Sequence, residues 1–178
     1  MNSQDFVVPA RSWGNIHSVA ETIRNAIGLS NVPYVPIVDV LEKIMDHQLN
    51  MLRFEVGDHT EMGGAEGLAD PNGEFIIIRE DVYEKAVGGD GRARFTIAHE
   101  LGHFFLHTGI PLARSVAGDG VKPFCKSEPQ ANQFAAEFLM PRSLITPSMN
   151  RFNIAINHGV SDEAANLRFK YLSNLRAK

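Results

Sequence analysis

The chain has 178 residues, 44% of them hydrophobic and 21% charged, a composition that fits a globular domain and excludes disordered, collagen-like and coiled-coil proteins. Its 17 Lys and Arg against 21 Asp and Glu give a net charge of −4, which disfavours nucleic-acid binding as the main activity. We see no apolar run long enough for a bilayer and no export signal, and the single cysteine allows no internal disulfide. We therefore expect a cytoplasmic protein without a membrane partner.

The first half of the chain predicts two helices followed by a small sheet. Apolar residues recur at helical spacing over 15–27 and again over about 38–45. Three strands are expected next, over 49–54, around Leu68 and over 74–79, where β-branched residues are frequent. The turn sequence Asp-Pro-Asn-Gly separates the last two strands, so we expect them to form a hairpin.

The second half is predicted to be helical. A segment over 92–107 is apolar nearly all round the helical wheel, so we expect a buried helix. Burying a polar side chain is unfavourable unless it has a partner, so the polar residues of this helix are expected to have a structural or functional role. A long irregular segment, 108–127, follows; it is expected to be a lid or docking loop, or else a connector. Further helices are expected over 127–140, 148–157 and 161–175.

These elements together predict an α+β fold: a mostly helical domain with a small three-stranded sheet. We assign residues 1–14 to an N-terminal extension and 15–178 to a single domain. Within that domain, the last two helices, over 148–175, can form a small helical subdomain.

The most informative motif is His99-Glu100-Leu101-Gly102-His103, which lies in the predicted buried helix. Two His four residues apart project from one helix face, about 6 Å apart along the axis, so both imidazoles can reach one zinc ion. Glu100 lies about 100° round the helix and flanks the pair, where a carboxylate can take a proton from a metal-bound water. The motif therefore predicts two metal ligands and a general base on one element.

A catalytic zinc ion needs a third protein ligand and an open fourth position. Glu128 is favoured, because Asn132 shares its helix face and can accept the outer N–H of a ligand imidazole. Glu137 stays open as an alternative, although it lies about 180° from Glu128 on the wheel and fits a surface or ion-paired carboxylate. Cys125 fits a half-buried small side chain better than a ligand. His107 lies about 12 Å from His99 along the helix, so we expect it behind the ligands or as a helix C-terminal group.

The sequence over 94–107, Arg-Phe-Thr-Ile-Ala-His-Glu-Leu-Gly-His-Phe-Phe-Leu-His, resembles the ImmA/IrrE family of HEXXH, gluzincin-like zinc metallopeptidases. A second block over 128–141 is equally similar to that family, and weaker similarity extends over 35–41 and 159–168. The resemblance covers nearly the whole chain, from about 15 to 175, and implies a zincin-like domain with the HEXXH motif on its active-site helix.

The resemblance implies zinc bound by His99, His103 and Glu128, with Glu100 as the catalytic base, and manganese remains an alternative metal in vivo. It also implies a protein substrate: a helix-turn-helix (Xre-type) repressor or antitoxin encoded nearby, whose cleavage relieves repression in toxin–antitoxin systems, mobile elements or stress responses. The residues alone do not single out a second oxyanion donor; Tyr83, His59 and Arg79 are the candidates.

One departure from the family is Ile78-Arg79 at the end of the predicted strand, where a small polar residue such as Asn is usual. Arg79 is expected to be a solvent-facing residue, or to alter which peptide pairs with that strand edge.

Two other functions are considered beside peptidase activity. A non-proteolytic binding module would sequester a repressor partner without cutting it. Direct DNA binding by the last two helices would use the basic tail, which has no acidic residue after Glu163, but packing of two helices on the core explains the same pattern. We do not expect direct nucleic-acid binding.

Overall fold

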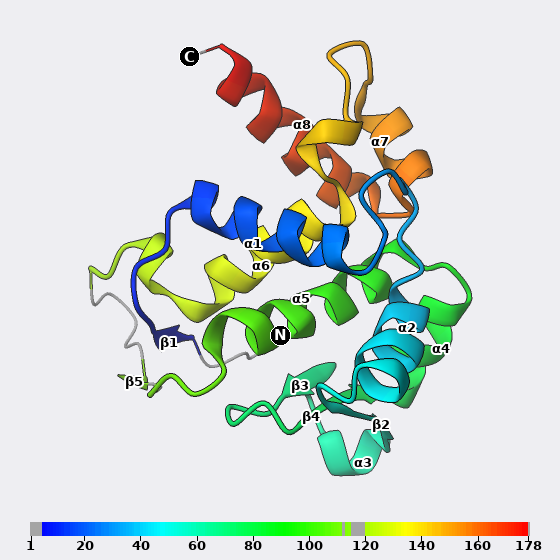
Figure 1. Ribbon diagram of the computed structural model, residues 1–178, viewed down its shortest axis with the longest axis vertical. Helices are drawn as coiled ribbons and strands as arrows, with labels where there is room; N and C mark the ends of the chain where they lie inside the picture. Colours follow the sequence, from blue (N-terminus) through cyan, green and yellow to red (C-terminus); the bar gives the residue numbers. More distant parts are fainter. Residues whose placement is uncertain (1–4, 112, 115–119, 178) are drawn as a thin grey trace.

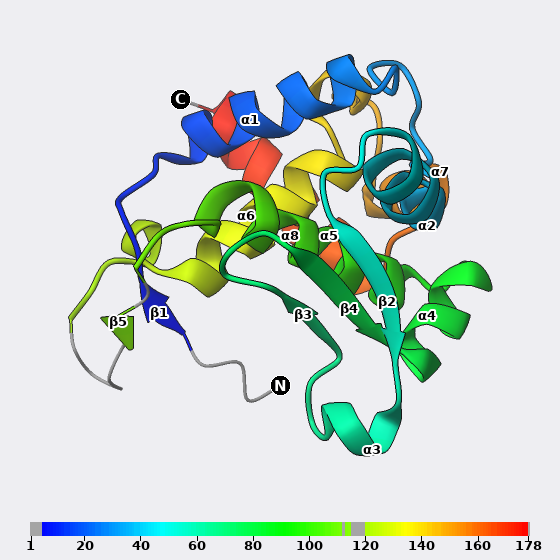
Figure 2. The same cartoon turned by 60° about the horizontal axis from the view of Figure 1, so that its bottom comes forward.

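The computed structural model describes residues 5–111, 113–114 and 120–177, and it has the mostly helical α+β fold that the sequence predicts. Three helices lie across its middle (Figure 1): α1 (Trp13–Ala26), α5 (Gly91–His107) and α6 (Ser127–Leu139). Helix α6 packs against both α1 and α5. The small sheet lies against α5 on one side (Figure 2), and the C-terminal helices lie at the opposite end of the molecule (Figure 1).

Local signals explain where the central helices begin. The side chain of Ser12 accepts a hydrogen bond from the backbone of Asn15 at the start of α1, and Asp90 accepts from Arg92 and Ala93 at the start of α5. The apolar faces of these helices form a continuous core with α6. Its members without solvent exposure include Ile16, Ala20, Ile97, Ala98, Leu101, Phe134, Ala135 and Phe138.

The three strands β2 (Arg53–Gly57), β3 (Gly67–Ala69) and β4 (Phe75–Arg79) form one sheet in the order β2-β4-β3. Strand β3 is antiparallel to β4, with Gly67 opposite Ile78, so the predicted hairpin is confirmed. Strand β2 runs parallel to β4. Because β4 is paired on both sides, its edge cannot accept a peptide, and the expectation of pairing at the strand that ends in Arg79 is wrong.

The first half of the chain also contains elements that the sequence reading missed. Helix α4 (Glu80–Val87) directly follows β4 and buries Val82 and Ala86. A short helix, α3 (His59–Met62), follows β2. The helix predicted over about 38–45, by contrast, is present as α2 (Ile37–Asp39), which continues as the π-helix η1 (Val40–Gln48); β2 begins four residues later than predicted.

The predicted irregular segment over 108–127 contains two short elements. Strand β5 (Ala113–Arg114) pairs with β1 (Phe6–Val7), and the 3-10 helix η2 (Pro123–Cys125) precedes α6. Residues 112 and 115–119 of the segment expected to be a lid or docking loop lie outside the described residues, so that expectation stays a prediction.

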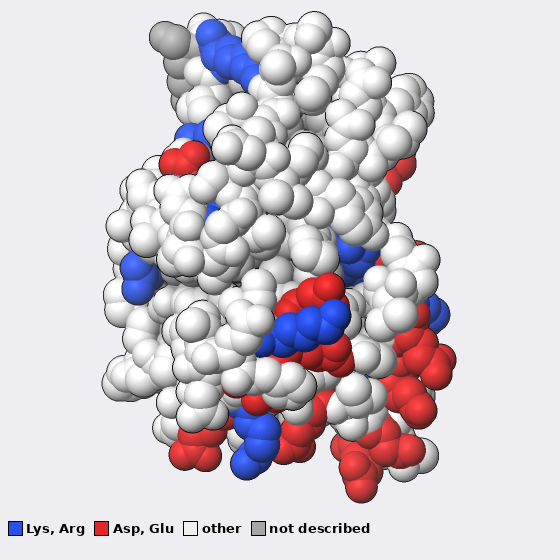
Figure 3. Space-filling view, turned by 45° about the vertical axis from the view of Figure 1, so that its right-hand side comes forward, with Lys and Arg blue, Asp and Glu red and all other residues white. Residues whose placement is uncertain are grey.

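The C-terminal end consists of η3 (Arg142–Leu144), α7 (Arg151–His158) and α8 (Asp162–Arg176). Ser161 caps α8 as predicted, by accepting a hydrogen bond from the backbone of Ala164. In Figure 3, acidic side chains gather at the end formed by the sheet, α3 and α4, whereas the end formed by α7 and α8 shows few charges. Arg168, one of the basic residues of the tail, is buried and paired with Glu137, so it is not available to bind nucleic acid.

Within the described part of the chain, none of the helices is both long enough and apolar enough to span a membrane.

Candidate metal centre

The close approach of α5 and α6 depends on the glycine of the HEXXH motif. A Cβ atom added to Gly102 would lie 3.0 Å from the backbone oxygen of Ala131 and 3.2 Å from the Cβ atom of Phe134. Both neighbours belong to α6, so a side chain at this position would push the two helices apart. Helix α5 carries His99 and His103 and helix α6 carries Glu128, so the distance between the two helices sets the distance between these side chains.

We expect Gly102→Val to lower the free energy of unfolding by about 1–3 kcal/mol, because the overpacked interface must open. Urea denaturation of the full chain measures this loss. Gly64→Val is the matched control, because a Cβ atom there meets nothing within 4 Å. Equal stability of the Gly102 variant and the wild type would contradict this reading of the interface.

The two motif histidines point in the same direction from α5. Their Nε2 atoms lie 2.9 Å apart, and the two side chains are 15% and 19% exposed. Burial lowers the pKa of His99, but the hydrogen bond with Glu128 and the charge of Glu100 raise it above the ordinary value. Because both side chains are partly exposed, the imidazole pair faces solvent on one side, where an ion can enter.

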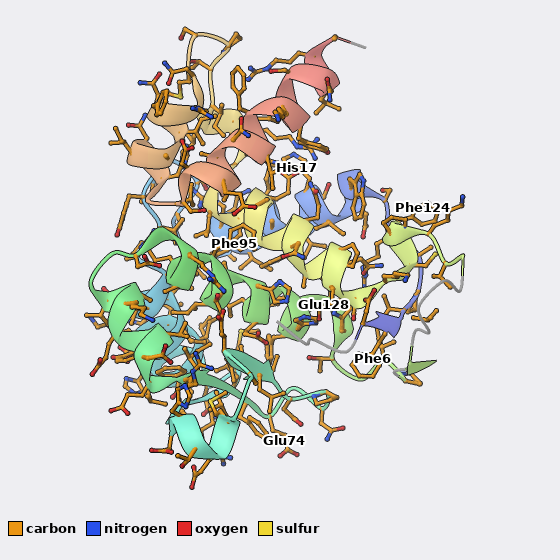
Figure 4. The ribbon with its side chains drawn as sticks, turned by 180° about the vertical axis from the view of Figure 1, so that it is seen from behind. Phe6, His17, Glu74, Phe95, Phe124 and Glu128 are labelled. Atoms are coloured by element: carbon orange, nitrogen blue, oxygen red, sulfur yellow. The ribbon has the colours of Figure 1, made fainter. Side chains whose placement is uncertain are left out.

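Glu128 lies in the first turn of α6 (Figure 4), and its carboxylate faces both imidazoles. Its carboxylate oxygens lie 3.3 Å from Nε2 of His99 and 3.2 Å from Nε2 of His103. Although burial raises the pKa of Glu128, the facing imidazoles of His103 and His99 lower it well below its usual range, so the carboxylate is ionised.

The spacing of these three donors fits a metal ion. Tetrahedral ligands at about 2.0–2.1 Å from zinc lie about 3.3–3.4 Å from one another. The three side chains present ligand atoms that all lie within 4.8 Å of one another, with the closest pairs at 2.9–3.3 Å. Two imidazoles and one carboxylate are a donor set of catalytic zinc sites, which leave one position for water.

Glu100 lies beside this donor set and is only 8% exposed. Its side chain contacts β3: a Cβ atom added to Gly67 would lie 2.6 Å from the Cγ atom of Glu100. Burial raises the pKa of the Glu100 carboxyl, more than the nearby His103 and His99 lower it. A carboxylate with a raised pKa is suited to taking up and releasing a proton near neutral pH.

Each imidazole has a second partner on its outer nitrogen. Nδ1 of His99 lies 3.1 Å from Oδ1 of Asn132, and Nδ1 of His103 lies 3.1 Å from Nδ1 of His107. Burial, together with the charge of His103, lowers the pKa of His107 to about 4, so its ring is neutral near neutral pH. Such contacts orient the rings that face a metal.

The other sequence candidates have different environments. Glu137 is fully buried and paired with Arg142 and Arg168, so its expected ion-pair role is right and its alternative place on the surface is wrong. Cys125 lies in η2 and is half-buried. Among the described residues, the group of donor atoms consists of the two histidines and Glu128 without this cysteine.

The three candidate oxyanion donors are not gathered at the donor set by any contact of the described residues. The hydroxyl of Tyr83 donates to Glu42 at 2.6 Å. Arg79 is bound to Asp81 and donates to the carbonyl oxygen of Ala65, and its side chain is only 11% exposed, so it is not the solvent-facing residue that we expected. His59 is exposed in α3.

The sequence reading missed the residue that caps the helix carrying Glu128. Lys126 stands at the N-cap position of α6, but its side chain makes no capping hydrogen bond to the helix. Instead, Oδ1 of Asp5 accepts from the backbone N–H of Glu128 at 3.2 Å and from the hydroxyl of Ser127 at 3.4 Å. Asp5 lies 123 residues from Glu128 along the chain, so no local pattern marks it.

We expect Asp5→Ala to destabilise the protein by about 1 kcal/mol, because it removes an N-terminal helix cap. Thermal unfolding measures this effect, with Asp58→Ala, which removes the cap of the exposed helix α3, as the control. Because α6 carries Glu128, we also expect the metal affinity to fall in the Asp5 variant and to stay unchanged in the control. Wild-type stability and wild-type metal affinity in the Asp5 variant would refute this role.

Two imidazoles four residues apart on a buried helix, a facing carboxylate from the next helix and a flanking buried carboxylate are the arrangement of metal-dependent peptidases. A family model, Peptidase_M78, described as the IrrE N-terminal-like domain, matches residues 63–170. This is more than half of the chain, so the chain belongs to this family of metal-dependent peptidases, and the resemblance to the ImmA/IrrE family is confirmed. No match was found among curated proteins.

Proposed function

We propose that the protein is a zinc-dependent endopeptidase in which His99, His103 and Glu128 bind the metal and Glu100 is the catalytic base. The observation that carries this proposal is the convergence of two imidazole nitrogens and one carboxylate within 4.8 Å of one another. Family membership supports the peptidase class. The proposal fits a catalytic rather than a structural site, since structural zinc sites are closed by four protein ligands.

The bound ion would lower the pKa of a water molecule toward about 7 and polarise the scissile carbonyl group. In our proposal, the carboxylate of Glu100 accepts the proton of the attacking water. Glu100 then donates that proton to the nitrogen of the departing amine. The contact between Glu100 and Gly67 keeps the carboxylate beside the imidazoles, and its burial excludes competing solvent.

We place the substrate along β3. This strand is at one edge of the sheet and lies against Glu100 through Gly67. An extended peptide can add to such an edge by backbone hydrogen bonds, which would bring a peptide bond next to the carboxylate. The exposed Leu68, 48% exposed, is available to contact side chains of the added peptide.

The proposed substrate is a helix-turn-helix repressor or antitoxin encoded nearby, in a cytoplasmic toxin–antitoxin, stress-response or other transcription-regulating system. This part of the proposal is supported by the resemblance to the ImmA/IrrE family over the two blocks at 94–107 and 128–141.

The test is incubation of the full chain with the neighbouring repressor under three conditions: added zinc, added manganese, and chelator. We expect cleavage fragments, identified by mass spectrometry, with metal and none with chelator. A stable complex in which the repressor stays intact with zinc present would instead identify a non-proteolytic binding module.

A further inference from the structure

A chain of polar side chains runs from His103 into the protein interior. Nδ1 of His103 lies 3.1 Å from Nδ1 of His107, and Nε2 of His107 lies 3.2 Å from Oε1 of Gln130. Gln130 is fully buried, and its amide nitrogen donates to the backbone oxygens of Pro9 at 2.9 Å and Phe124 at 2.8 Å. Each polar atom in this chain has a defined neighbour.

The direction of these hydrogen bonds is determined from the buried end. Backbone oxygens only accept, so the amide nitrogen of Gln130 must face Pro9 and Phe124 and its oxygen must face His107. That oxygen also only accepts, so Nε2 of His107 carries the hydrogen. A neutral imidazole has one N–H, and Nδ1 of His107 is therefore an acceptor.

The same reasoning extends to His103. Because Nδ1 of His107 accepts, Nδ1 of His103 must donate, and Nε2 is the nitrogen of His103 that remains for a metal ion. This is the nitrogen that faces Glu128 at 3.2 Å. Metal ligation requires an unprotonated ring nitrogen, so the buried chain leaves His103 in the tautomer that can bind an ion.

We infer that Gln130 is a positioning residue of the metal centre, which fixes the tautomer of His107 and, through it, the tautomer of His103. The inference rests on the proposed function, since it takes His103 as a ligand. Asn132, the partner of His99, is by contrast exposed. The carbonyls that orient Gln130 belong to the N-terminal segment and to η2, so both segments contribute to the order of the site.

The direct test is nitrogen-15 NMR of the histidine rings in the metal-free full chain, with signals assigned by single His variants. We expect the hydrogen on Nδ1 of His103 and on Nε2 of His107. A His103 ring without a hydrogen on Nδ1 would overturn the inference. The measurement needs neither metal nor substrate, so its outcome is independent of whether the protein cleaves a repressor.

A second test uses Gln130→Met, which keeps the length of the side chain and removes its amide. We expect zinc affinity, measured by competition with a chromophoric chelator, to fall about 10–100-fold, as for loss of other groups behind metal ligands. NMR should then show loss of the hydrogen from Nδ1 of His103. The control is Gln48→Met, which changes an exposed glutamine. Wild-type affinity in Gln130→Met would contradict the role.

The residue between Gln130 and the ligand gives a pair of variants in case Gln130→Met does not fold. In His107→Asn, the side-chain oxygen takes the place of Nδ1 and can still accept from His103, whereas His107→Leu offers no acceptor. We expect zinc affinity near that of the wild type for Asn and a 10–100-fold loss for Leu, restricted to the metal site. Equal affinity of the two variants would refute the proposed relay.

Discussion

The Glu100→Gln variant is expected to bind metal with the affinity of the wild type and to cleave its substrate about 10²–10⁴-fold more slowly, the usual contribution of a general base. Gln keeps the size of the side chain and its place against Gly67, but its amide cannot take up the proton of a water molecule. Because the change removes a buried ionisable group, we expect no loss of stability. Cleavage rate at saturating metal is the measurement.

The matched control for this variant is Glu84→Gln, which changes an exposed glutamate of α4. We expect the control to cleave at the wild-type rate. Unreduced cleavage by Glu100→Gln would show that another group takes the proton. Loss of metal binding in the same variant would show instead that Glu100 acts on the donor set itself.

The largest effect on stability is expected from Glu137→Ala. The Glu137 carboxylate accepts hydrogen bonds from Arg168 at 2.6 Å and from Arg142 at 2.5 Å. Arg168 is 2% exposed, so removal of its partner leaves a buried positive charge without compensation. Breaking such a pair costs about 3–5 kcal/mol, and we expect a loss of that size in urea unfolding.

Glu84→Ala and Glu128→Ala provide the comparison for this variant. The first changes an exposed carboxylate and should leave stability nearly unchanged. The second should abolish metal binding but, in the metal-free protein, cost much less stability than Glu137→Ala. If Glu137→Ala unfolded at the wild-type urea concentration, the ion-pair cluster would not be holding α6 and α8 together.

The same cluster predicts how stability depends on pH. Although burial raises it, the hydrogen bonds with Arg168 and Arg142 lower the pKa of Glu137 to about 2, from 4.5 in an unfolded chain. A lowered carboxyl pKa stabilises the folded state fully above the unfolded value, and the contribution is lost as the pH falls from 4.5 toward 2. The stability difference between wild type and Glu137→Gln should therefore shrink over this range.

Much of the fold was predictable because its signals are local. Helical spacing of apolar residues indicated α1, α5 and α6, and the Asp-Pro-Asn-Gly turn indicated the hairpin of β3 and β4. Helix α4 was not predicted, because only Val82 and Ala86 of its eight residues are buried. Two buried positions are too few to show helical periodicity, and a glycine-rich segment follows directly. The pairing of β1 with β5 joins segments far apart in the chain and has no local signal.

The candidate site was predictable to a similar extent. Spacing alone indicates that His99 and His103 share a helix face, and the neighbouring position of Asn132 favours Glu128; the structure brings these side chains together. Their roles in catalysis remain predictions. The cap from Asp5, the contact of Gly67 with Glu100 and the orientation of Gln130 depend on tertiary packing, which the order of residues does not reveal.

The account depends on one ion bound between α5 and α6. The most direct test is a crystal structure of the zinc-loaded chain, with anomalous difference maps recorded on both sides of the zinc absorption edge. We predict one peak about 2.0–2.2 Å from Nε2 of His99, Nε2 of His103 and a carboxylate oxygen of Glu128. A zinc peak elsewhere, or none between these three side chains at saturating zinc, would contradict the account.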